Sequence, residues 1–145
     1  YIKGNELGTH KDSESVVKVI AGKYKNVEGP EKNHNVEPIY FHIILNEDKE
    51  FKCEVPKGHN SFIYVLKGEL KIGKKNHLKI NDSNLILLER GDQLAVKAYK
   101  KTEFLFIAGK PIGEPIARGG PFVMNTKDEI LEAINDYNNG TFAKY

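Results

Sequence analysis

Two absences set the first limits on this sequence. Only one cysteine, Cys53, is present, which excludes an internal disulfide and leaves the redox compartment open, with the reducing cytoplasm as the default expectation. No run approaches the roughly 18 apolar residues of a membrane-spanning helix, and no charged-then-apolar leader opens the chain. We therefore expect a soluble intracellular protein.

The printed chain also lacks an initiator, because it begins at Tyr1 and its only methionine is Met124. We expect that an upstream segment has been removed, and processing, design and proteolysis are all compatible with that.

An excess of charge of either sign is missing as well. The chain has 22 Lys and Arg against 20 Asp and Glu, a net charge of +2, and its charges are interspersed. The absence of a basic block argues against nucleic acid as a direct partner. At 145 residues the chain is long enough to bury a core without a disulfide or a metal, so stability does not require a cofactor.

What is present is a series of short runs rich in β-branched and aromatic residues, separated by turns that contain Gly, Pro, Asn and Asp. Each run has the length of one strand, and the spacing is typical of a sandwich or barrel. The predicted strands are Val16–Ile20, Ile39–Leu45, Phe62–Leu66, Glu69–Ile72, Leu85–Leu88, Gln93–Ala98 and Glu103–Ile107.

One helix is predicted over about 126–139. Thr126 and Glu129 have the spacing of a capping box, and Gly140 follows as a stop. Ile130, Leu131, Ile134 and Tyr137 form an apolar stripe that is expected to pack on a core. We therefore expect an N-terminal arm over 1–15, a β-barrel over 16–108, and a C-terminal extended segment and helix over 109–145. This last part is expected to pack on the barrel or on a further domain.

The segment from Gly58 to Leu70 resembles the first conserved segment of cupins, which are double-stranded β-helix or jelly-roll barrels. The expected fold is thus an all-β cupin with one C-terminal helix. A metal-binding cupin has two histidines, and then a glutamate seven residues before the closing glycine. Here Ser61 stands at the glutamate position, and Val55 and Lys57 stand near the histidine positions. We expect no metal and no catalytic residue in this chain.

Two of the five histidines are candidates for a binding role. His42 shares a strand face with Tyr40 and is a candidate to point into the barrel, while His59 lies at a strand entry. Tyr40, His42, His59 and Ser61 are therefore the candidate ligand-binding residues. The remaining histidines lie in polar stretches and are expected to be solvated; they are His10, His34 and His77. Because His77 is the last, the later strands supply no imidazole.

Residues 109–116, 120–126 and the helix with the following 138–142 closely resemble the C-terminal signature of pirins. Shorter runs at 19–22, 58–60, 65–68 and 87–92 are similar to the family in the same order, so the resemblance extends over roughly 16–142. It implies the second half of a tandem cupin whose N-terminal half holds iron. An intact parent would resemble a quercetin 2,3-dioxygenase or a transcriptional co-regulator, and a eukaryotic member can be nuclear.

Two hypotheses follow. The chain is a metal-free, non-catalytic module whose partner is the N-terminal cupin half, a second copy or a regulatory protein. Alternatively, it is an autonomous small-molecule binder or weak enzyme that uses the barrel interior. An interior filled with side chains such as Ile63 and Val65 would favour the first.

The strip from Pro111 to Val123 is more apolar than a solvated connection requires, which makes it a candidate interface. Its interface candidates are Ile112, Ile116, Phe122 and Val123, with Phe122 as the anchor. The alternative is that the strip wraps its own barrel and delivers the helix.

Overall fold

The computed structural model describes residues 3–31, 35–73 and 78–143. The chain divides into two compact units, Tyr1–Pro111 and Ile112–Tyr145. The first unit contains twelve of the fourteen described strands, and the second contains one short hairpin and the helix α1.

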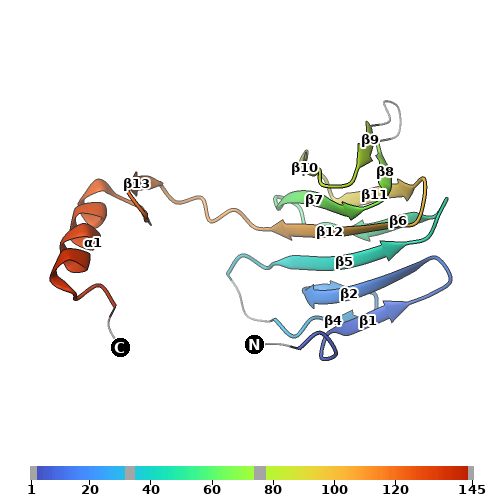
Figure 1. Cartoon of the computed structure of the whole chain (residues 1–145), viewed down its shortest axis with the longest axis horizontal. Helices are drawn as coiled ribbons and strands as arrows, with labels where there is room; N and C mark the ends of the chain where they lie inside the picture. Colours follow the sequence, from blue (N-terminus) through green and yellow to red (C-terminus); the bar gives the residue numbers. More distant parts are fainter. Residues whose placement is uncertain (1–2, 32–34, 74–77, 144–145) are drawn as a thin grey trace. The chain divides into compact units, whose positions relative to one another are not determined.

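The first unit contains a six-stranded antiparallel sheet in the order β1-β2-β5-β12-β7-β10 (Figure 1). Its strands are β1 (Gly8–Lys11), β2 (Ser15–Ala21), β5 (Ile39–Leu45), β12 (Thr102–Gly109), β7 (Asn60–Lys67) and β10 (Leu85–Leu88). β12 lies between β5 and β7, although these strands are far apart in sequence. This sheet therefore joins the two ends of the first unit.

A four-stranded antiparallel sheet has the order β6-β11-β8-β9. Its strands are β6 (Glu50–Glu54), β11 (Gln93–Ala98), β8 (Glu69–Ile72) and β9 (Leu78–Asn81), and a small hairpin forms from β3 (Lys23–Tyr24) and β4 (Val27–Glu28). The fold is the expected all-β cupin jelly roll with a single helix in the described residues.

The core of the first unit lies between the two sheets. Alternate residues of β2, β5 and β12 are buried, as expected for a half-buried sheet. Phe104 from the six-stranded sheet meets Phe51 from the four-stranded sheet with ring centroids 6.0 Å apart, and Tyr24 stacks on Phe51 at 5.4 Å. Phe41 and Phe106 continue this aromatic cluster at 6.2 Å.

A buried threonine joins the two sheets where β7 passes into β8. The Thr102 hydroxyl accepts a hydrogen bond from the Glu69 amide at 2.9 Å and lies 2.7 Å from the Lys100 carbonyl oxygen. Gly68 has φ of 107° at this turn, and a Cβ there would lie 2.5 Å from the Thr102 hydroxyl oxygen. The closing glycine of the cupin-like segment is therefore required both by its backbone conformation and by the close approach of β12.

Four predicted strands have the observed bounds: Ile39–Leu45, Glu69–Ile72, Leu85–Leu88 and Gln93–Ala98. The other three extend further at both ends, because pairing with neighbouring strands continues past the apolar run. The strands β1, β3, β4, β6 and β9 of the first unit were not predicted, and neither was the β13–β14 hairpin of the second. β1 falls inside the stretch that was predicted to be an arm, and it pairs with β2 over four residues.

The second unit is a small hairpin with a helix. β13 (Ala117–Gly119) pairs with β14 (Phe122–Met124), and α1 (Lys127–Asn139) follows. The predicted capping box is confirmed, since Thr126 accepts from the Glu129 amide and Glu129 accepts from the Thr126 amide. Gly140 ends the helix in the left-handed conformation.

Only part of the predicted apolar stripe of α1 is covered. Ile130 and Ala133 are buried, and a side chain at Gly119 would collide with Ile130. Leu131 and Tyr137 are exposed by 59% and 68%. These two residues are not covered within the second unit, and the packing of α1 on the barrel or on a further domain stays a prediction.

Among the described residues, no helix has the length and apolar character needed to cross a membrane.

Thr102→Val keeps the shape of the side chain and removes the hydroxyl that satisfies the Glu69 amide. We expect the free energy of unfolding to fall by about 1–3 kcal/mol, because a buried donor loses its partner. Urea denaturation followed by circular dichroism measures this change. Thr9→Val is the control, since the Thr9 hydroxyl is exposed and binds only the Leu7 carbonyl. Equal destabilisation by the two variants would contradict the prediction.

Candidate functional site

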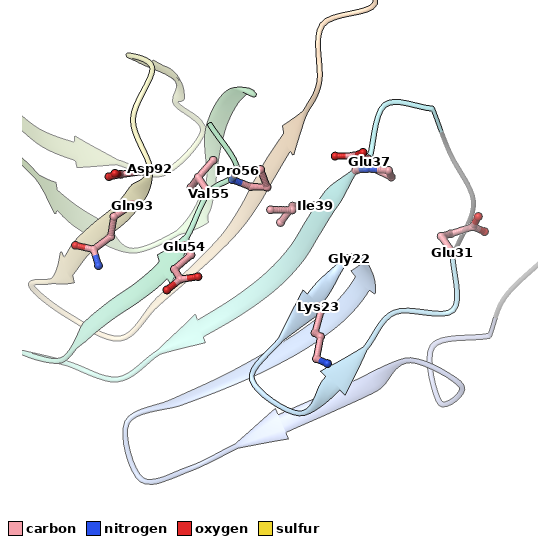
Figure 2. Close-up of a pocket in the computed structure, with 11 residues that line it drawn as sticks. Gly22, Lys23, Glu31, Glu37, Ile39, Glu54, Val55, Pro56, Asp92 and Gln93 are labelled. Atoms are coloured by element: carbon pink, nitrogen blue, oxygen red, sulfur yellow. The ribbon is translucent and has the colours of Figure 1, made fainter. Parts of the chain in front are cut away.

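A pocket of about 940 Å³ opens at one end of the jelly roll, where several strands begin or end (Figure 2). Gly22 and Lys23 come from the turn between β2 and β3, and Ile39 begins β5. Glu31, Glu37 and Pro38, which precede β5, also line it. The opposite wall comes from the end of β6 and the start of β11, with Glu54, Val55, Pro56, Asp92 and Gln93. We call this site the mouth pocket.

The mouth pocket combines an apolar surface with an acidic border. Ile39 and Val55 are buried side chains that line it. The carboxylates of Glu37, Glu54 and Asp92 also line it and are exposed at the residue level. Such a surface suits a small molecule with an apolar body and a positively charged or hydrogen-bond-donating group. Among the residues that the structure describes, the lining contains no cysteine, serine or histidine, so carboxylates are its ionisable acidic groups.

His59 lies beside this pocket. Its side chain is only 2% exposed, and its Nε2 atom lies 3.7 Å from Oε2 of Glu37, which lines the pocket. Within the described part of the chain, the buried Nδ1 atom has no hydrogen-bond partner. Glu37 itself has a positive φ of 45°, a conformation that non-glycine residues adopt rarely. His59 is therefore a buried polar residue whose hydrogen-bonding capacity is only partly used.

The four candidate ligand-binding residues do not come together. Tyr40 and His42 lie on the outer face of β5, because Ile39, Phe41, Ile43 and Leu45 are the buried residues of that strand. The expectation that His42 points into the barrel is therefore wrong. Its Nε2 atom instead contacts Oε1 of Glu103 on the neighbouring strand, at 2.6 Å. Alternation shows which residues share a face, but not which of two apolar faces is the inner one.

Ser61 lies on the same face of β7 as Ile63 and Val65, and it is partly buried. Ile63 and Val65 have no exposed surface, and neither do Phe104 and Phe106 across from them. Aliphatic and aromatic side chains therefore fill the interior beside β7 and β12, whereas a second pocket of about 640 Å³ is lined by Ser61 and Val55 with apolar residues of β10 and β11. A binding role for Tyr40, His42, His59 and Ser61 stays a prediction.

The positions that hold a metal in other cupins carry side chains of the wrong chemistry. Val55 is a buried aliphatic residue, Lys57 is exposed, and Ser61 offers only a hydroxyl. In residues 3–31, 35–73 and 78–143, no group of three or more His, Cys, Asp or Glu side chains is arranged to hold a metal ion. This donor set does not fit a transition metal.

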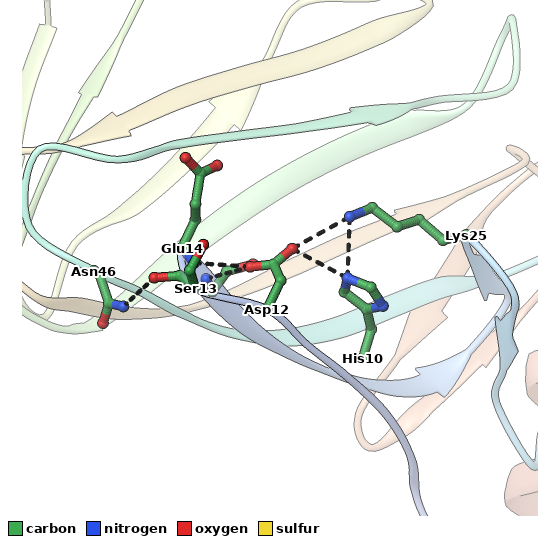
Figure 3. Close-up of polar contacts among 7 residues, drawn as sticks. His10, Asp12, Ser13, Glu14, Lys25 and Asn46 are labelled. Atoms are coloured by element: carbon green, nitrogen blue, oxygen red, sulfur yellow. Dashed lines mark hydrogen bonds and ion pairs between the residues drawn. The ribbon is translucent and has the colours of Figure 1, made fainter.

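A polar cluster joins the β1–β2 hairpin to the β3–β4 turn (Figure 3). Asp12 accepts hydrogen bonds from the amides of Ser15 and Glu14, at 2.8 and 2.9 Å. Its other oxygen lies 3.1 Å from Nε2 of His10 and 3.3 Å from Nζ of Lys25. These contacts, the two amides first, hold the pKa of the Asp12 carboxyl far below its ordinary value.

His10 is accordingly not the solvated residue that the sequence indicated. Its ring packs edge-on against Tyr24, with centroids 5.5 Å apart, and it belongs to the Asp12 cluster. His34 and His77 lie outside the described residues.

Burial raises the pKa of the Cys53 thiol to about 12. The thiol is therefore protonated at neutral pH and is not an activated nucleophile. This agrees with its interpretation as a small strand residue, since it packs against the core from β6.

The interface candidates of the C-terminal strip fall into two groups. Ile112, Ile116 and Val123 are exposed by 72%, 72% and 60%. Phe122 is partly buried, and its ring packs on Tyr137 and Phe142 within its own unit, at 6.1 and 5.1 Å. A substitution of Phe122 would thus disturb this unit as well as any interface.

The acidic residues of the mouth pocket were not singled out from the sequence. Glu37, Glu54 and Asp92 stand next to turn residues at strand ends, where charged side chains are common. Their only sequence signal is this position, and it does not say that three separate strand ends meet. Their grouping therefore depends on the tertiary structure.

A comparison with family models matches residues 40–143 to the Pirin C-terminal cupin domain. Pirin from Rattus norvegicus is 35% identical over 142 residues, which cover 95% of this chain and 48% of that protein. A putative quercetin 2,3-dioxygenase from Pseudomonas aeruginosa is 34% identical over 134 residues, covering 92% of this chain and 46% of the relative. The chain spans about half the length of these curated relatives.

Among solved structures, a quercetin 2,3-dioxygenase from Acinetobacter baumannii superposes with a TM-score of 0.84 at 32% sequence identity. The match covers 99% of this chain and 50% of the other.

Asp12→Asn tests the electrostatic part of the Asp12 cluster, because the amide oxygen can still accept from Ser15 and Glu14. A lowered pKa means that the carboxylate stabilises the fold above its ordinary pKa of 3.8 and loses this effect as the pH falls further. The melting temperature of Asp12→Asn should therefore lie below that of the wild type at neutral pH, and the gap should narrow toward pH about 2. A pH-independent gap would contradict this. Asp48→Asn, which removes an exposed ion pair with Lys97, is the control and should have little effect.

Proposed function

This chain belongs to the pirin family, as its C-terminal cupin domain, and from this we propose that it is a metal-free, non-catalytic domain that supports a second, metal-bearing cupin half. Family membership shows which kind of domain this chain is. The side chains in the interior of the jelly roll suggest that the domain has a supporting role. The proposed partner is the N-terminal cupin half of the same protein.

The filled interior of the jelly roll is the observation that carries this proposal. A cupin that acts on a substrate needs inward-facing ligands and space beside them. Here the inward positions of β7 and β12 hold Ile63, Val65, Phe104 and Phe106, all fully buried. At these positions a substrate would have to push the side chains apart, at a large cost in packing.

The chemistry of the ligand positions supports the same proposal. Iron bound by a cupin needs imidazole and carboxylate groups, and Val55, Lys57 and Ser61 offer neither. An ammonium group on Lys57 would also repel a cation. We therefore derive no catalytic step for this chain, and we propose that iron belongs to the other half.

The activity of the whole protein is part of the proposal. The relatives include proteins named quercetin 2,3-dioxygenase and Pirin, and each is about twice as long as the matched segment. We propose that the parent is a metal-dependent quercetin dioxygenase or a transcriptional co-regulator, located in the cytoplasm or, in a eukaryote, in the nucleus. A regulatory protein would then be a further partner.

The mouth pocket favours one alternative, an autonomous small-molecule binder. Its volume of about 940 Å³ is in the range of ligand sites. The incompletely bonded His59 lies next to it. This alternative uses the mouth of the fold instead of its interior, and it does not require a metal.

The isolated chain should bind no transition metal at a defined site, because the ligand positions hold no suitable donors. Elemental analysis after purification without chelators and extensive dialysis measures this directly. His42→Gln and His59→Gln should leave the metal content unchanged. Close to one equivalent of iron, nickel, copper or zinc, lowered by either substitution, would refute the proposal.

The chain should also show no quercetin dioxygenase turnover when iron is added, since flavonol oxidation by these proteins needs a metal with open positions. Oxygen consumption with quercetin as substrate is the measurement, and the intact parent is the positive control. Iron-dependent turnover by the isolated chain that persists through purification would promote the autonomous enzyme in place of the supporting domain.

A further inference from the structure

The mouth pocket has an excess of negative charge that the chain as a whole does not have. Its lining carboxylates are those of Glu31, Glu37, Glu54 and Asp92. In the described part of the lining, one side chain is cationic, that of Lys23, whose Nζ atom lies 3.4 Å from Oε1 of Glu28, a residue outside the lining. The whole chain, in contrast, has a net charge of +2. The negative charge is therefore a local property of this pocket.

A buried imidazole with incomplete hydrogen bonding lies next to one of these carboxylates. The His59 side chain is only 2% exposed, and its Nδ1 atom has no hydrogen-bond partner within the described ranges. Its Nε2 atom faces Oε2 of Glu37 at 3.7 Å, which is longer than a hydrogen bond. Buried polar atoms are ordinarily satisfied, and an exception calls for an explanation such as a polar group supplied from outside the chain. His59 and Glu37 together therefore point to a ligand.

Backbone hydrogen bonds hold both walls of the pocket in place. On one side, the Val36 carbonyl accepts from the Lys110 amide at 2.7 Å, and this contact anchors the residue before Glu37. On the other side, the Val55 amide donates to the Asp92 carbonyl at 2.9 Å, which joins the end of β6 to the start of β11. A site that is largely formed in advance loses less conformational freedom when a ligand binds.

The floor of the pocket is apolar, which separates an organic cation from a metal ion. Ile39 and Val55 are buried side chains of the lining, and Pro38 and Pro56 stand beside them (Figure 2). In the ranges that the structure describes, no three acidic, histidine or cysteine side chains converge as metal ligands do. An ammonium group has three donors that can bond separate acceptors, and its apolar body can cover the floor.

We propose that the mouth pocket binds a small organic cation, a primary ammonium group carried on an apolar body. The ammonium group binds Glu37 beside His59 and lies in the field of Glu54 and Asp92, while the body covers Ile39 and Val55. This inference rests on the binding alternative given above for the mouth pocket and names its ligand class. It does not depend on the supporting role of the domain.

Charge selects against the other classes of small ligand. A carboxylate or phosphate group would be repelled by the lining carboxylates, so an anion of the same shape is excluded. A neutral ligand would gain the apolar contacts alone. Each exposed carboxylate contributes only modestly, because water screens it. The preference for a cation therefore depends on several carboxylates acting together.

Amide NMR titrations of the chain with three probes of similar shape test the proposal. The probes are 2-phenylethylammonium, neutral 2-phenylethanol and anionic 3-phenylpropanoate. We expect saturable binding of the ammonium probe with a dissociation constant below about 10 mM, as is usual for a ligand of this size. The alcohol should bind at least about fivefold more weakly, and the anion should not bind. Added salt should weaken binding of the ammonium probe only.

The same spectra locate the bound probe. The amides of Gly22, Val55 and Gln93 should shift with the ammonium probe, because these residues line the pocket. The ring protons of His59 should shift with them. His10, which belongs to the Asp12 cluster and not to the lining, is the reference and should keep its ring shifts.

Isosteric variants test the carboxylates one at a time. Glu37→Gln and Glu54→Gln should each weaken binding of the ammonium probe by about threefold, and the double variant by about tenfold, since each loses one charge. Their binding of the alcohol should not change. Glu47→Gln is the matched control, because Glu47 is an exposed glutamate of the same unit that does not line the pocket. The amide spectrum of each variant establishes that it is folded, and the comparison of the three probes needs no variant.

Several results would overturn this inference. They are no saturable shift with the ammonium probe, equal affinity for the ammonium probe and the alcohol, shifts at His10 instead of His59, or Glu37→Gln and Glu54→Gln variants that bind as Glu47→Gln does. None of these results bears on the supporting role, which the metal analysis and the turnover assay test. Conversely, metal binding or turnover would refute the supporting role and leave selective binding of the cation in place.

Discussion

The packing of large side chains between the two sheets of the first unit is the interaction on which the other features depend. Phe51 and Phe104 meet across the sheets, and Phe41 and Phe106 fill the space beside them. Close packing of this kind leaves little free volume in a protein interior. The space available for a ligand therefore lies in pockets toward the ends of the fold, and not between these side chains.

The inner and outer faces of the six-stranded sheet are subject to different constraints. The inner face contributes most of the buried core, so its residues are constrained by volume. The outer face is free of that constraint and yet stays apolar, whereas the outer face of the four-stranded sheet is polar. The two sheets of one core therefore differ in the surface that they present to their surroundings.

The second unit has a small core of its own. Up to residue 143, where the description of the chain ends, its buried apolar residues are Ile130 and Ala133, and the rings of Phe122, Tyr137 and Phe142 pack together beside them. So small a core supplies little stability by itself, since units of this size seldom fold alone. Its capping box and hairpin define its local structure, and its exposed apolar residues remain available for contact.

Several features of this protein follow from residues that are close together in the sequence. Alternation defined the bounds of four strands, and the capping box placed the start of α1. These features depend on neighbours along the chain, so the sequence alone was sufficient. The tertiary structure decided which face of β5 points inward, and hence where His42 lies, because both faces are apolar. It also assembled the mouth pocket and the Asp12 cluster, whose members are brought together by pairing between strands distant in sequence.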